Sequence, residues 1–348
     1  MTSTLEIQEN AVKPDAIYEL ALGFAVTKTL LTAHRLGLFE ALSDAEKSAE
    51  ELAQEKGLAT NPTEMLLNAC VTLKLCRKIE GRYTNTPLAQ RFLTHDGGHD
   101  LGQFLDHFND HMVPAWTYLE DAVRTGHAQI QRLVGDKNDH FFQAIDKGTK
   151  DLEIFMETME QHSLLEGEAL ARTYDFSAHR ELLDVGGGTG AMDVAIVRAH
   201  PHLRAVVFDR PPVCAIARRK IQEHGLAEQI HSEPGDFFKD PLPRRADVLL
   251  LSGILHNWSP VNAKAILRQC AQALPVGGTL LISEQLLNAD KTGPLPAALC
   301  SLNMLVMMEG GQEYNEAEYN DFLVYSGFQF LETRSTGGLR QLLIARRI

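Results

Sequence analysis

A glycine-rich segment follows a short apolar run in the second half of the chain. Residues 182–190 read LLDVGGGTG, with Asp184 ahead of Gly186 and Gly188. Glycine lets the backbone adopt positive φ angles and approach a ligand closely, because no Cβ stands in the way. The segment therefore predicts a strand that turns sharply beneath a nucleoside. Taken alone, the glycines also satisfy the looser dinucleotide pattern G-x-G-x-x-[GA], so they leave the kind of nucleoside open.

Acidic residues follow the next two strands that the sequence predicts. Asp209 ends the second strand, and Asp236 and Phe237 follow a third in the sequence PGDFF. The carboxyl ends of parallel strands open onto one crevice, so we expect these side chains to line a single site. There Asp209 can accept hydrogen bonds from both ribose hydroxyls, while Asp236 meets the amino group of adenine and Phe237 covers the base. Each acid taken alone could equally be a helix cap or a turn residue.

A histidine after the fourth predicted strand is the candidate for proton transfer. His256 lies in LSGILHNWSP, and an imidazole with an ordinary pKa of ~6.5 suits removal of a proton from a hydroxyl near neutral pH. Glu284 ends the fifth strand, and Glu313 lies in EGGQEYNEAEY. Either carboxylate can bond the other ring nitrogen, fix its tautomer and stabilise the imidazolium. We therefore predict catalytic roles for His256, Glu284 and Glu313.

Short apolar runs alternate with helical segments after residue 180. This alternation predicts an α/β fold, with a parallel sheet covered by helices on both faces. Two final runs, 328–333 and 340–345, are joined by STGG and predict an antiparallel hairpin added to the sheet edge. That hairpin and the acid before the glycines favour a site for S-adenosylmethionine over a dinucleotide site. The four parallel runs are 182–185, 205–209, 248–252 and 279–284.

The first part of the chain predicts a mainly helical domain. Apolar residues recur at helical spacing over residues 14–35 on more than one side, so we expect a second subunit to cover this helix. A winged-helix outline follows, from two helices and a small hairpin. Its signals are the capping box of Ser48 and Glu51, the helix end at Gly57, the helix start at Asn61, Pro62 and Glu64, and the hairpin 76–84 around Gly81.

Winged helices often bind DNA, but the charge of this segment argues against that role. Residues 1–110 carry ten Lys and Arg against sixteen Asp and Glu, whereas DNA reading needs a basic face against phosphates. The whole chain has a net charge of −13, which also disfavours anionic membranes. We expect an architectural wing, a homodimer, and neither nucleic acid nor membrane as a partner.

Length and composition indicate two domains in a reduced compartment. The 348 residues, 44% of them hydrophobic, favour domains at 1–110 and 111–348. The five scattered cysteines and the absence of a recognisable signal sequence predict a cytoplasmic protein. The apolar segment 20–39 is interrupted by Lys28, His34 and Arg35, so we expect it not to span a membrane. Four histidines at 95, 99, 107 and 111 have partly chelating spacing, but no recognised ligand set completes it, and we predict no metal.

Together the motifs resemble the O-methyltransferase family of plant caffeate and flavonoid enzymes, acetylserotonin methyltransferase and bacterial polyketide-tailoring methyltransferases. The resemblance runs from the helical N-terminal region through LLDVGGGTG, FDRPPV, PGDFF, LHNW and EGGQE. It implies a Rossmann-like methyltransferase domain, a dimerisation domain, S-adenosylmethionine as cofactor, metal independence, and His256 as the base between Glu284 and Glu313. The cofactor contacts that we expect are Asp184, Gly186, Gly188, Asp209, Arg210, Asp236, Phe237 and Ser252.

The acceptor pocket is less well defined by the sequence. Methionines adapt to flat, irregular rings, so those after residue 300 favour a phenolic or polyketide-like aromatic acceptor. The alternative is a methionine-rich helix that is simply buried. The residues that we expect to line the pocket are Trp116, Asn257, Asn303, Met304 and Met307.

The chain departs from the family pattern at two places. Asn257 follows the catalytic histidine where the family usually has aspartate, and Tyr314 and Asn315 follow Glu313 where arginine and threonine are common. Some relatives keep the cofactor and perform hydroxylation, decarboxylation or pericyclic chemistry, so a non-methylating relative is the main alternative. A winged-helix regulator that senses a nucleoside and a dehydrogenase are the weaker ones.

Overall fold

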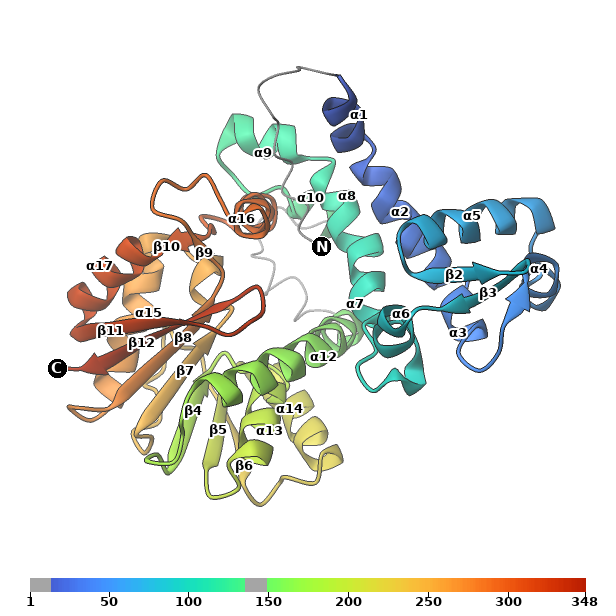
Figure 1. The fold of residues 1–348 in the computed structure, drawn as a ribbon. Coiled ribbons are helices and arrows are strands. Elements are labelled where there is room, and N and C mark those ends of the chain that lie inside the picture. Colours follow the sequence, from blue (N-terminus) through green and yellow to red (C-terminus); the bar gives the residue numbers. More distant parts are fainter. Residues whose placement is uncertain (1–13, 135–148) are drawn as a thin grey trace. The chain divides into compact units, whose positions relative to one another are not determined.

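The chain divides into two compact units, Met1–Asn109 and Asp110–Ile348, in a computed structural model that describes residues 14–134 and 149–348 (Figure 1). The first unit is helical with one small antiparallel sheet, as expected. Its elements are α1 (Asp15–Ala21), α2 (Gly23–Arg35), α3 (Leu38–Ala41), β1 (Lys47–Ser48), α4 (Ala49–Lys56), α5 (Thr60–Thr72), β2 (Cys76–Ile79), β3 (Arg82–Asn85), α6 (Pro87–Phe92), η1 (His95–Gly97) and α7 (Gly102–His107).

The winged-helix outline predicted for this unit is confirmed, with one helix start corrected. Ser48 caps α4 through a complete capping box with Glu51, and Gly57 ends that helix in the left-handed conformation. β2 and β3 pair as the expected hairpin, and the short β1 adds a third strand. Helix α5 begins at Thr60 after Ala59, so Asn61 is not its cap. Proline tolerates any position in the first turn of a helix, which is why Pro62 alone could not fix the start.

The N-terminal helix is broken and largely exposed. The chain leaves regular helical geometry at Leu22, so the expected single helix becomes α1 and α2. Its apolar side chains Ile17, Leu20 and Phe24 are more than half exposed, whereas Leu31 is buried within the unit. By length and composition the stretch Asp15–Arg35 could cross a membrane, so our exclusion on the basis of its charges was too strict. One such helix near an N-terminus is weak evidence for a membrane span.

His95 and Asp106, both in the histidine-rich stretch 95–111, form ion pairs. His95 Nδ1 lies 2.6 Å from Asp100 Oδ2, and Asp106 faces His34 at 3.6 Å. Asp106 also lies 3.7 Å from Arg35 Nε, so it contacts two side chains of α2.

The second unit is built on a seven-stranded sheet in the order β11-β12-β8-β7-β4-β5-β6. The five strands from β8 to β6 are parallel, and β12 and β11 are antiparallel additions. This confirms the predicted Rossmann-like sheet with a C-terminal hairpin. The strands are β4 (Glu181–Val185), β5 (Arg204–Asp209), β6 (Ile230–Pro234), β7 (Val248–Ser252), β8 (Thr279–Glu284), β11 (Phe328–Ser335) and β12 (Gln341–Arg347).

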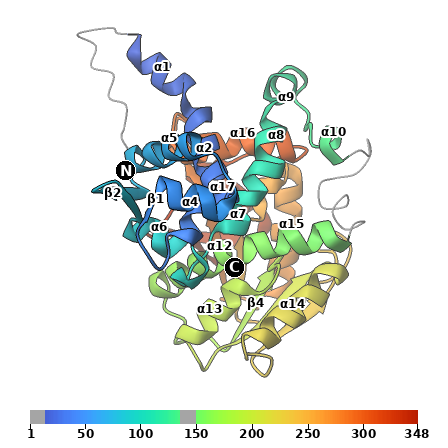
Figure 2. The same ribbon diagram turned by 90° about the vertical axis from the view of Figure 1, so that its right-hand side faces the viewer.

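Helices cover both faces of this sheet, as the alternating pattern predicted. One face packs against α12, α13 and α14 in a core around Leu182, and the other packs against α15 and α17 in a core around Leu249. In the turned view α12 runs beside α13 and α14 (Figure 2). These helices are α12 (Thr149–Thr173), α13 (Ala191–Ala199), α14 (Pro211–Glu223), α15 (Pro260–Ala273) and α17 (Glu316–Ser326).

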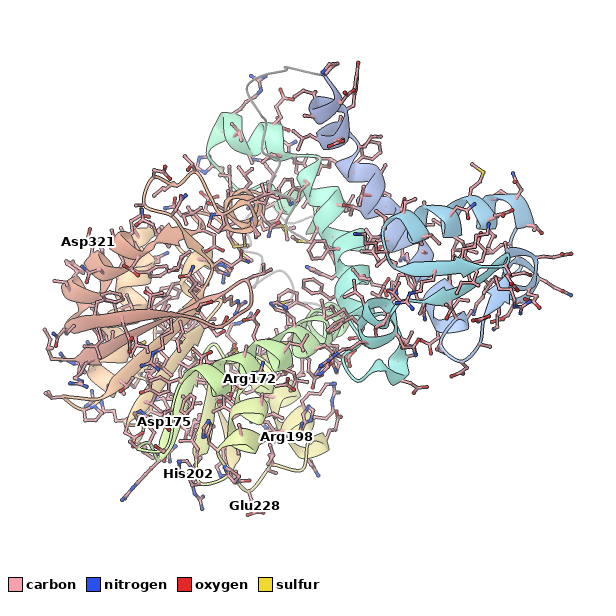
Figure 3. The ribbon with its side chains drawn as sticks, viewed as in Figure 1. Arg172, Asp175, Arg198, His202, Glu228 and Asp321 are labelled. Carbon is pink, nitrogen blue, oxygen red and sulfur yellow. The ribbon has the colours of Figure 1, made fainter. Side chains whose placement is uncertain are left out.

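Three polar side chains mark the outer surface of this unit. Arg198, His202 and Asp321 are exposed and point away from the sheet (Figure 3). The remaining elements connect these layers or lie above the carboxyl ends of the strands. They are η2 (Phe108–Met112), α8 (Val113–Trp116), α9 (Leu119–Thr125), α10 (Gln131–Val134), η3 (Leu255–Asn257), β9 (Leu286–Leu287), α16 (Leu295–Met307) and β10 (Tyr314–Asn315).

Candidate active site

The carboxyl ends of the parallel strands meet where the strand order reverses. β5 and β6 extend to one side of β4, and β7 and β8 extend to the other. Such a reversal opens a crevice at the strand ends, where open α/β sheets bind their ligands. The residues predicted for the site lie at the ends of five strands, which the parallel register aligns.

The glycine turn after β4 has the geometry that the sequence predicted. Gly186 and Gly188 have φ angles of 79° and 59°, which L side chains rarely adopt. A Cβ on Gly186 would lie 2.4 Å from the Ile254 side chain. The Gly188 N–H donates a hydrogen bond to Asp209 Oδ2 at 3.0 Å. The turn is therefore fixed to the end of β5 and keeps its backbone open to a ligand.

Asp184 lies beneath this turn. It is 2% exposed, and its Oδ2 would be 2.6 Å from a Cβ on Gly187. Burial and the neighbouring carboxyl of Asp193 raise the pKa of Asp184 well above its usual range, because two carboxylates in contact cannot both ionise at low cost. Asp184 thus supports the turn from below, and a direct contact with the cofactor stays a prediction.

The acids that end β5 and β6 are held in place by local hydrogen bonds. Asp209 Oδ1 accepts a bond from the Arg210 N–H at 2.7 Å. Asp236 accepts bonds from the Phe238 N–H at 2.9 Å and from Lys239 Nζ at 2.7 Å. Burial opposes ionisation of Asp236, but these bonds and nearby positive charges outweigh it and lower its pKa. Asp236 therefore presents negative oxygen atoms, and the carboxylate oxygens of both acids can accept hydrogen bonds from hydroxyl and amino donors.

An aromatic cluster stands beside Asp236. The Phe237 ring meets Trp258 edge to face, with ring centroids 6.0 Å apart. Phe237 and Ile254 pack partly buried against the core of the sheet, close to where a Cβ on Gly186 would lie. This places an apolar surface next to the glycine turn, as required for covering a purine.

His256 is carried by the short turn η3 after β7, and Glu284 anchors that turn. Glu284, at the end of β8, is fully buried. Its Oε1 accepts hydrogen bonds from the backbone N–H groups of Ile254 and Leu255, both at 2.9 Å. Its Oε2 lies 3.5 Å from His256 Nδ1. One carboxylate therefore fixes the backbone of the turn and places its second oxygen near the histidine ring.

Glu313 holds the same ring nitrogen more closely. His256 Nδ1 donates to Glu313 Oε1 at 2.8 Å, so both carboxylates approach one nitrogen, whereas the sequence suggested opposite sides of the ring. The segment before Glu313 crosses the histidine turn: the Gln312 N–H donates to the His256 carbonyl at 2.9 Å. A Cβ on Gly311 would be 3.0 Å from that same carbonyl. The glycines of EGGQE thus allow a close backbone crossing.

Two opposing influences act on the pKa of His256. Burial favours the neutral ring, but the charges of Glu284 and Glu313, with hydrogen bonds to Cys300 and Glu313, outweigh it and raise the pKa well above its usual value. Burial also raises the pKa of Glu284, although the His256 charge counteracts this. With Nδ1 bonded to Glu313, Nε2 is the nitrogen that can exchange a proton with a substrate hydroxyl.

Cys300 belongs to this cluster and was missed by the sequence reasoning. It lies on α16, and one donor atom each of His256, Cys300 and Glu313 lie within 4.8 Å of one another. Burial raises the pKa of the Cys300 thiol. Its position was detectable, because Cys300 precedes Asn303, Met304 and Met307 by three, four and seven residues, the spacing of one helix face.

The residues expected to bind the acceptor differ in their contacts and burial. Trp116 Nε1 donates to Asn303 Oδ1 at 3.1 Å, so these two are brought together. Met304 and Met307 are buried in an apolar cluster. Asn257 donates to the carbonyls of Gly253 and Ile254 at 2.9 and 3.2 Å, which a carboxylate cannot do. Their contacts with an acceptor stay predictions.

Comparison with known proteins decides the family. The O-methyltransferase domain family matches residues 116–329, and the O-methyltransferase dimerisation domain family matches residues 18–95. The chain belongs to the O-methyltransferase family. The enzyme is 40% identical to 3-hydroxy-5-methyl-1-naphthoate 3-O-methyltransferase of Streptomyces sahachiroi, over 92% of this chain and 91% of the relative. It is 36% identical to acetylserotonin O-methyltransferase of Bos taurus, over 94% and 96%.

Solved structures agree and identify the cofactor. Human N-acetylserotonin methyltransferase in complex with S-adenosylmethionine superposes with a TM-score of 0.89 and 31% identity, over 98% of this chain and 99% of that one. PigF with S-adenosylhomocysteine superposes with a TM-score of 0.84 and 32% identity, over 97% and 100%. The enzyme is an S-adenosylmethionine-dependent O-methyltransferase. Its open glycine turn, acidic strand ends and adjoining aromatic surface fit this cofactor.

Proposed function

We propose that the enzyme methylates a hydroxyl of a small aromatic metabolite, with His256 as the general base. The observation that carries this proposal is the imidazole held by Glu313 at 2.8 Å and Glu284 at 3.5 Å at the end of β7. Relatives named for a hydroxylated naphthoate and for acetylserotonin support the acceptor class. Trp116 and the methionines of α16 offer apolar surface on the side of His256 that carries Cys300.

His256 accepts the hydroxyl proton on Nε2 as the acceptor oxygen forms its bond to the methyl carbon. Glu313 and Glu284 hold the ring on Nδ1 and stabilise the imidazolium that results. When bound, S-adenosylmethionine supplies the methyl group as its carbon–sulfur bond breaks. A positive charge bound beside His256 lowers the pKa of the imidazole, which makes the base available once the donor site is filled. Alignment of the reacting groups supplies most of the acceleration.

We assign the cofactor contacts to the residues that line the crevice. Asp209 accepts hydrogen bonds from ribose, Asp236 and Phe237 bind adenine, and Gly186 and Gly188 pass close to the amino acid portion. Arg210 and Ser252 flank these groups, and Asp184 supports the turn. Trp116, Asn257, Asn303, Met304 and Met307 form the acceptor side.

The enzyme acts as a homodimer in the cytoplasm. The match to a dimerisation domain and the exposed apolar residues of α1 and α2 support a dimer formed by the first of two domains, 1–110 and 111–348. All five cysteines are free thiols, in keeping with a reduced compartment.

A panel of candidate acceptors tests this function. Simple phenols, hydroxynaphthoates and an indole without a hydroxyl are incubated with S-adenosylmethionine, and products are detected by mass spectrometry. We expect a methyl gain on hydroxylated rings only. Cofactor binding without methylation of any hydroxylated ring would instead favour the non-methylating relatives of this fold.

A further inference from the structure

The tip of the C-terminal hairpin carries Arg340 to the end of β7. Arg340 Nη1 donates a hydrogen bond to Ser252 Oγ at 2.7 Å. A Cβ on Gly253, which has a φ of +63°, would lie 2.7 Å from Arg340 Nη2. Thr336 Oγ1 donates to the Arg340 carbonyl at 2.6 Å and fixes the loop. The guanidinium therefore lies over the backbone of Gly253, in space that any other residue at that position would fill.

This guanidinium has capacity for an anion. A guanidinium offers five N–H donors in a planar fork that matches a carboxylate. Among residues 14–134 and 149–348, no carboxylate forms an ion pair with Arg340, and Ser252 is its one side-chain hydrogen-bond partner. Its charge nevertheless acts on the crevice, because it lowers the pKa of the buried Glu284 against the effect of burial. A half-buried arginine with unused donors at a strand end indicates a bound anion.

A buried acid lies in range of the same charge. Glu166, on α12, is 9% exposed, and its Oε2 has no hydrogen-bond partner within the described part of the chain. Gly338, two residues before Arg340, would bring a Cβ to 3.7 Å from Glu166 Oε1, and the hairpin tip reaches toward α12 (Figure 1). A guanidinium with unused donors and a buried carboxylate oxygen without a hydrogen-bond partner match the carboxylate and ammonium groups of a free amino acid.

The position of Arg340 agrees with the donor side of the crevice. β7 pairs with β4, whose end forms the glycine turn. α12, which carries Glu166, also brings Met156 to 3.9 Å from where a Cβ on Gly188 would lie. The thiol and methionines that approach His256 are carried by a different element, α16. Arg340 therefore lies on the side where the amino acid portion of the cofactor is expected.

We propose that Arg340 binds the α-carboxylate of the methionine portion of S-adenosylmethionine, so that the C-terminal hairpin completes the donor site. The proposal depends on S-adenosylmethionine as the cofactor and on the proposed assignment of the glycine turn to its amino acid portion. It makes Arg340 a positioning residue, because it orients the donor without touching the transferred methyl group.

Calorimetry with a ligand pair tests the contact itself. S-Adenosylhomocysteine is compared with S-adenosyl-3-thiopropylamine, which lacks the carboxylate but keeps the nucleoside and the amine. We expect the full-length enzyme to bind S-adenosylhomocysteine about 10-fold or more tightly than the decarboxylated ligand, as for a charge-assisted hydrogen bond. Arg340→Gln should lose most of this preference by weakening S-adenosylhomocysteine alone, and Arg340→Lys should keep part of it.

The matched control is Arg334→Gln, which removes an arginine from the same hairpin that bonds Glu332 and the Thr173 carbonyl. It should leave the ligand preference unchanged. An equal loss of affinity for both ligands in Arg340→Gln would mean that the arginine only supports the fold. Unchanged affinities for both ligands, with a raised KM for a carboxylated acceptor, would mean that Arg340 contacts the acceptor instead. Either result overturns the proposal. If no acceptor is methylated but the carboxylate preference depends on Arg340, the inference stands and the proposed acceptor class fails.

Discussion

At the scale of single residues, the environment of His256 decides when it can act. Two buried carboxylates approach Nδ1, and their charges outweigh burial and raise the pKa of the ring. A protonated imidazole cannot take the hydroxyl proton, so turnover should fall as the pH drops below this raised pKa. In the proposed mechanism the same carboxylates stabilise the imidazolium after transfer. The raised pKa therefore makes His256 a stronger base, but it also keeps the ring protonated and unable to accept a proton at low pH.

Glu313→Gln should move this dependence toward lower pH. Removing one negative charge lowers the pKa of His256, so the acidic limb of the kcat profile should shift down by about 1 pH unit, while maximal turnover decreases. The measurement is kcat against pH at saturating cofactor. Glu309→Gln is the control, since Glu309 instead binds His127 and the Ala128 N–H. If the acidic limb of the kcat profile does not move in Glu313→Gln, this carboxylate does not set the pKa of the base.

The thiol beside His256 predicts sensitivity to soft metal ions. His256, Cys300 and Glu313 present donor atoms within 4.8 Å of one another, and zinc binds such nitrogen, sulfur and oxygen ligands. Added Zn²⁺ should therefore inhibit turnover, and a chelator should restore it. Cys300→Ser should need roughly tenfold or more Zn²⁺ for the same inhibition, because even outer partners of a metal site contribute that much. Equal inhibition of both forms would place the inhibitory ion elsewhere.

The sequence placed the candidate residues at the ends of predicted strands, but it did not give the contacts between them. Asp209, His256 and Glu284 each follow an apolar run, and a parallel sheet aligns such positions. The convergence of Glu284 and Glu313 on one nitrogen depends on the parallel pairing of β9 with β10, which sets Tyr314 beside Leu286. Two-residue strands leave no periodic signal, so this pairing could not be predicted.

At the scale of elements, the path of the glycine turn after β4 is fixed by its geometry. Gly186 combines a positive φ with a steric limit, since a Cβ would meet Ile254 at 2.4 Å. Both features follow from the path of the chain from β4 into α13. A side chain there has to displace Ile254, which precedes the turn that carries His256. The contact between Gly186 and Ile254 thus links the proposed donor site to the turn that carries His256.

Gly186→Ala should weaken S-adenosylhomocysteine binding strongly. The positive φ alone costs about 1 kcal/mol or more in stability, and the clash with Ile254 should add a loss of affinity of about tenfold. Calorimetry measures the affinity and thermal unfolding measures the stability. Gly225→Ala shares the positive φ, at +74°, but has nothing within 4 Å of its Cβ. If both variants bind the ligand equally well, the close approach at Gly186 has no functional role.

Elements with strong local signals were predicted well, and those set by tertiary contacts were not. The capping box at Ser48 and the glycine end at Gly57 fixed α4 on both sides. β6 reads IHSEP and lies at the sheet edge with mixed exposure, so it lacks the apolar run that marked its neighbours. The break at Leu22 has no proline or glycine at that residue, and the helical pattern ran through it.

At the scale of the whole molecule, the exposed apolar face of α1 and α2 favours a partner that covers it. Ile17, Leu20 and Phe24 are 66%, 61% and 72% exposed, and adjacent apolar side chains of this size rarely stay in water. A second copy of the chain is the cover that a dimerisation domain provides. Composition alone also allows a membrane, so the sequence could not separate the two.

The double variant Leu20→Glu with Phe24→Glu should dissociate the dimer. Each buried side chain of this size contributes about 1.5–3 kcal/mol, so dimer affinity should fall by at least a hundredfold. Sedimentation equilibrium measures the change. Val276→Glu, at a site 80% exposed in the catalytic unit, should remain dimeric. A wild-type chain that is monomeric in solution and floats with lipid vesicles would contradict the dimer and favour the membrane.

The central claim is that His256 removes the proton from the acceptor, and one comparison tests it most directly. The single-turnover rate of methyl transfer to a hydroxylated acceptor is measured for the wild type and for His256→Ala, alongside calorimetric affinity for S-adenosylhomocysteine. We expect a rate loss of about 10²–10⁴-fold, with cofactor affinity within about threefold of the wild type. A variant that keeps its rate, or that loses rate and affinity together, would contradict the account.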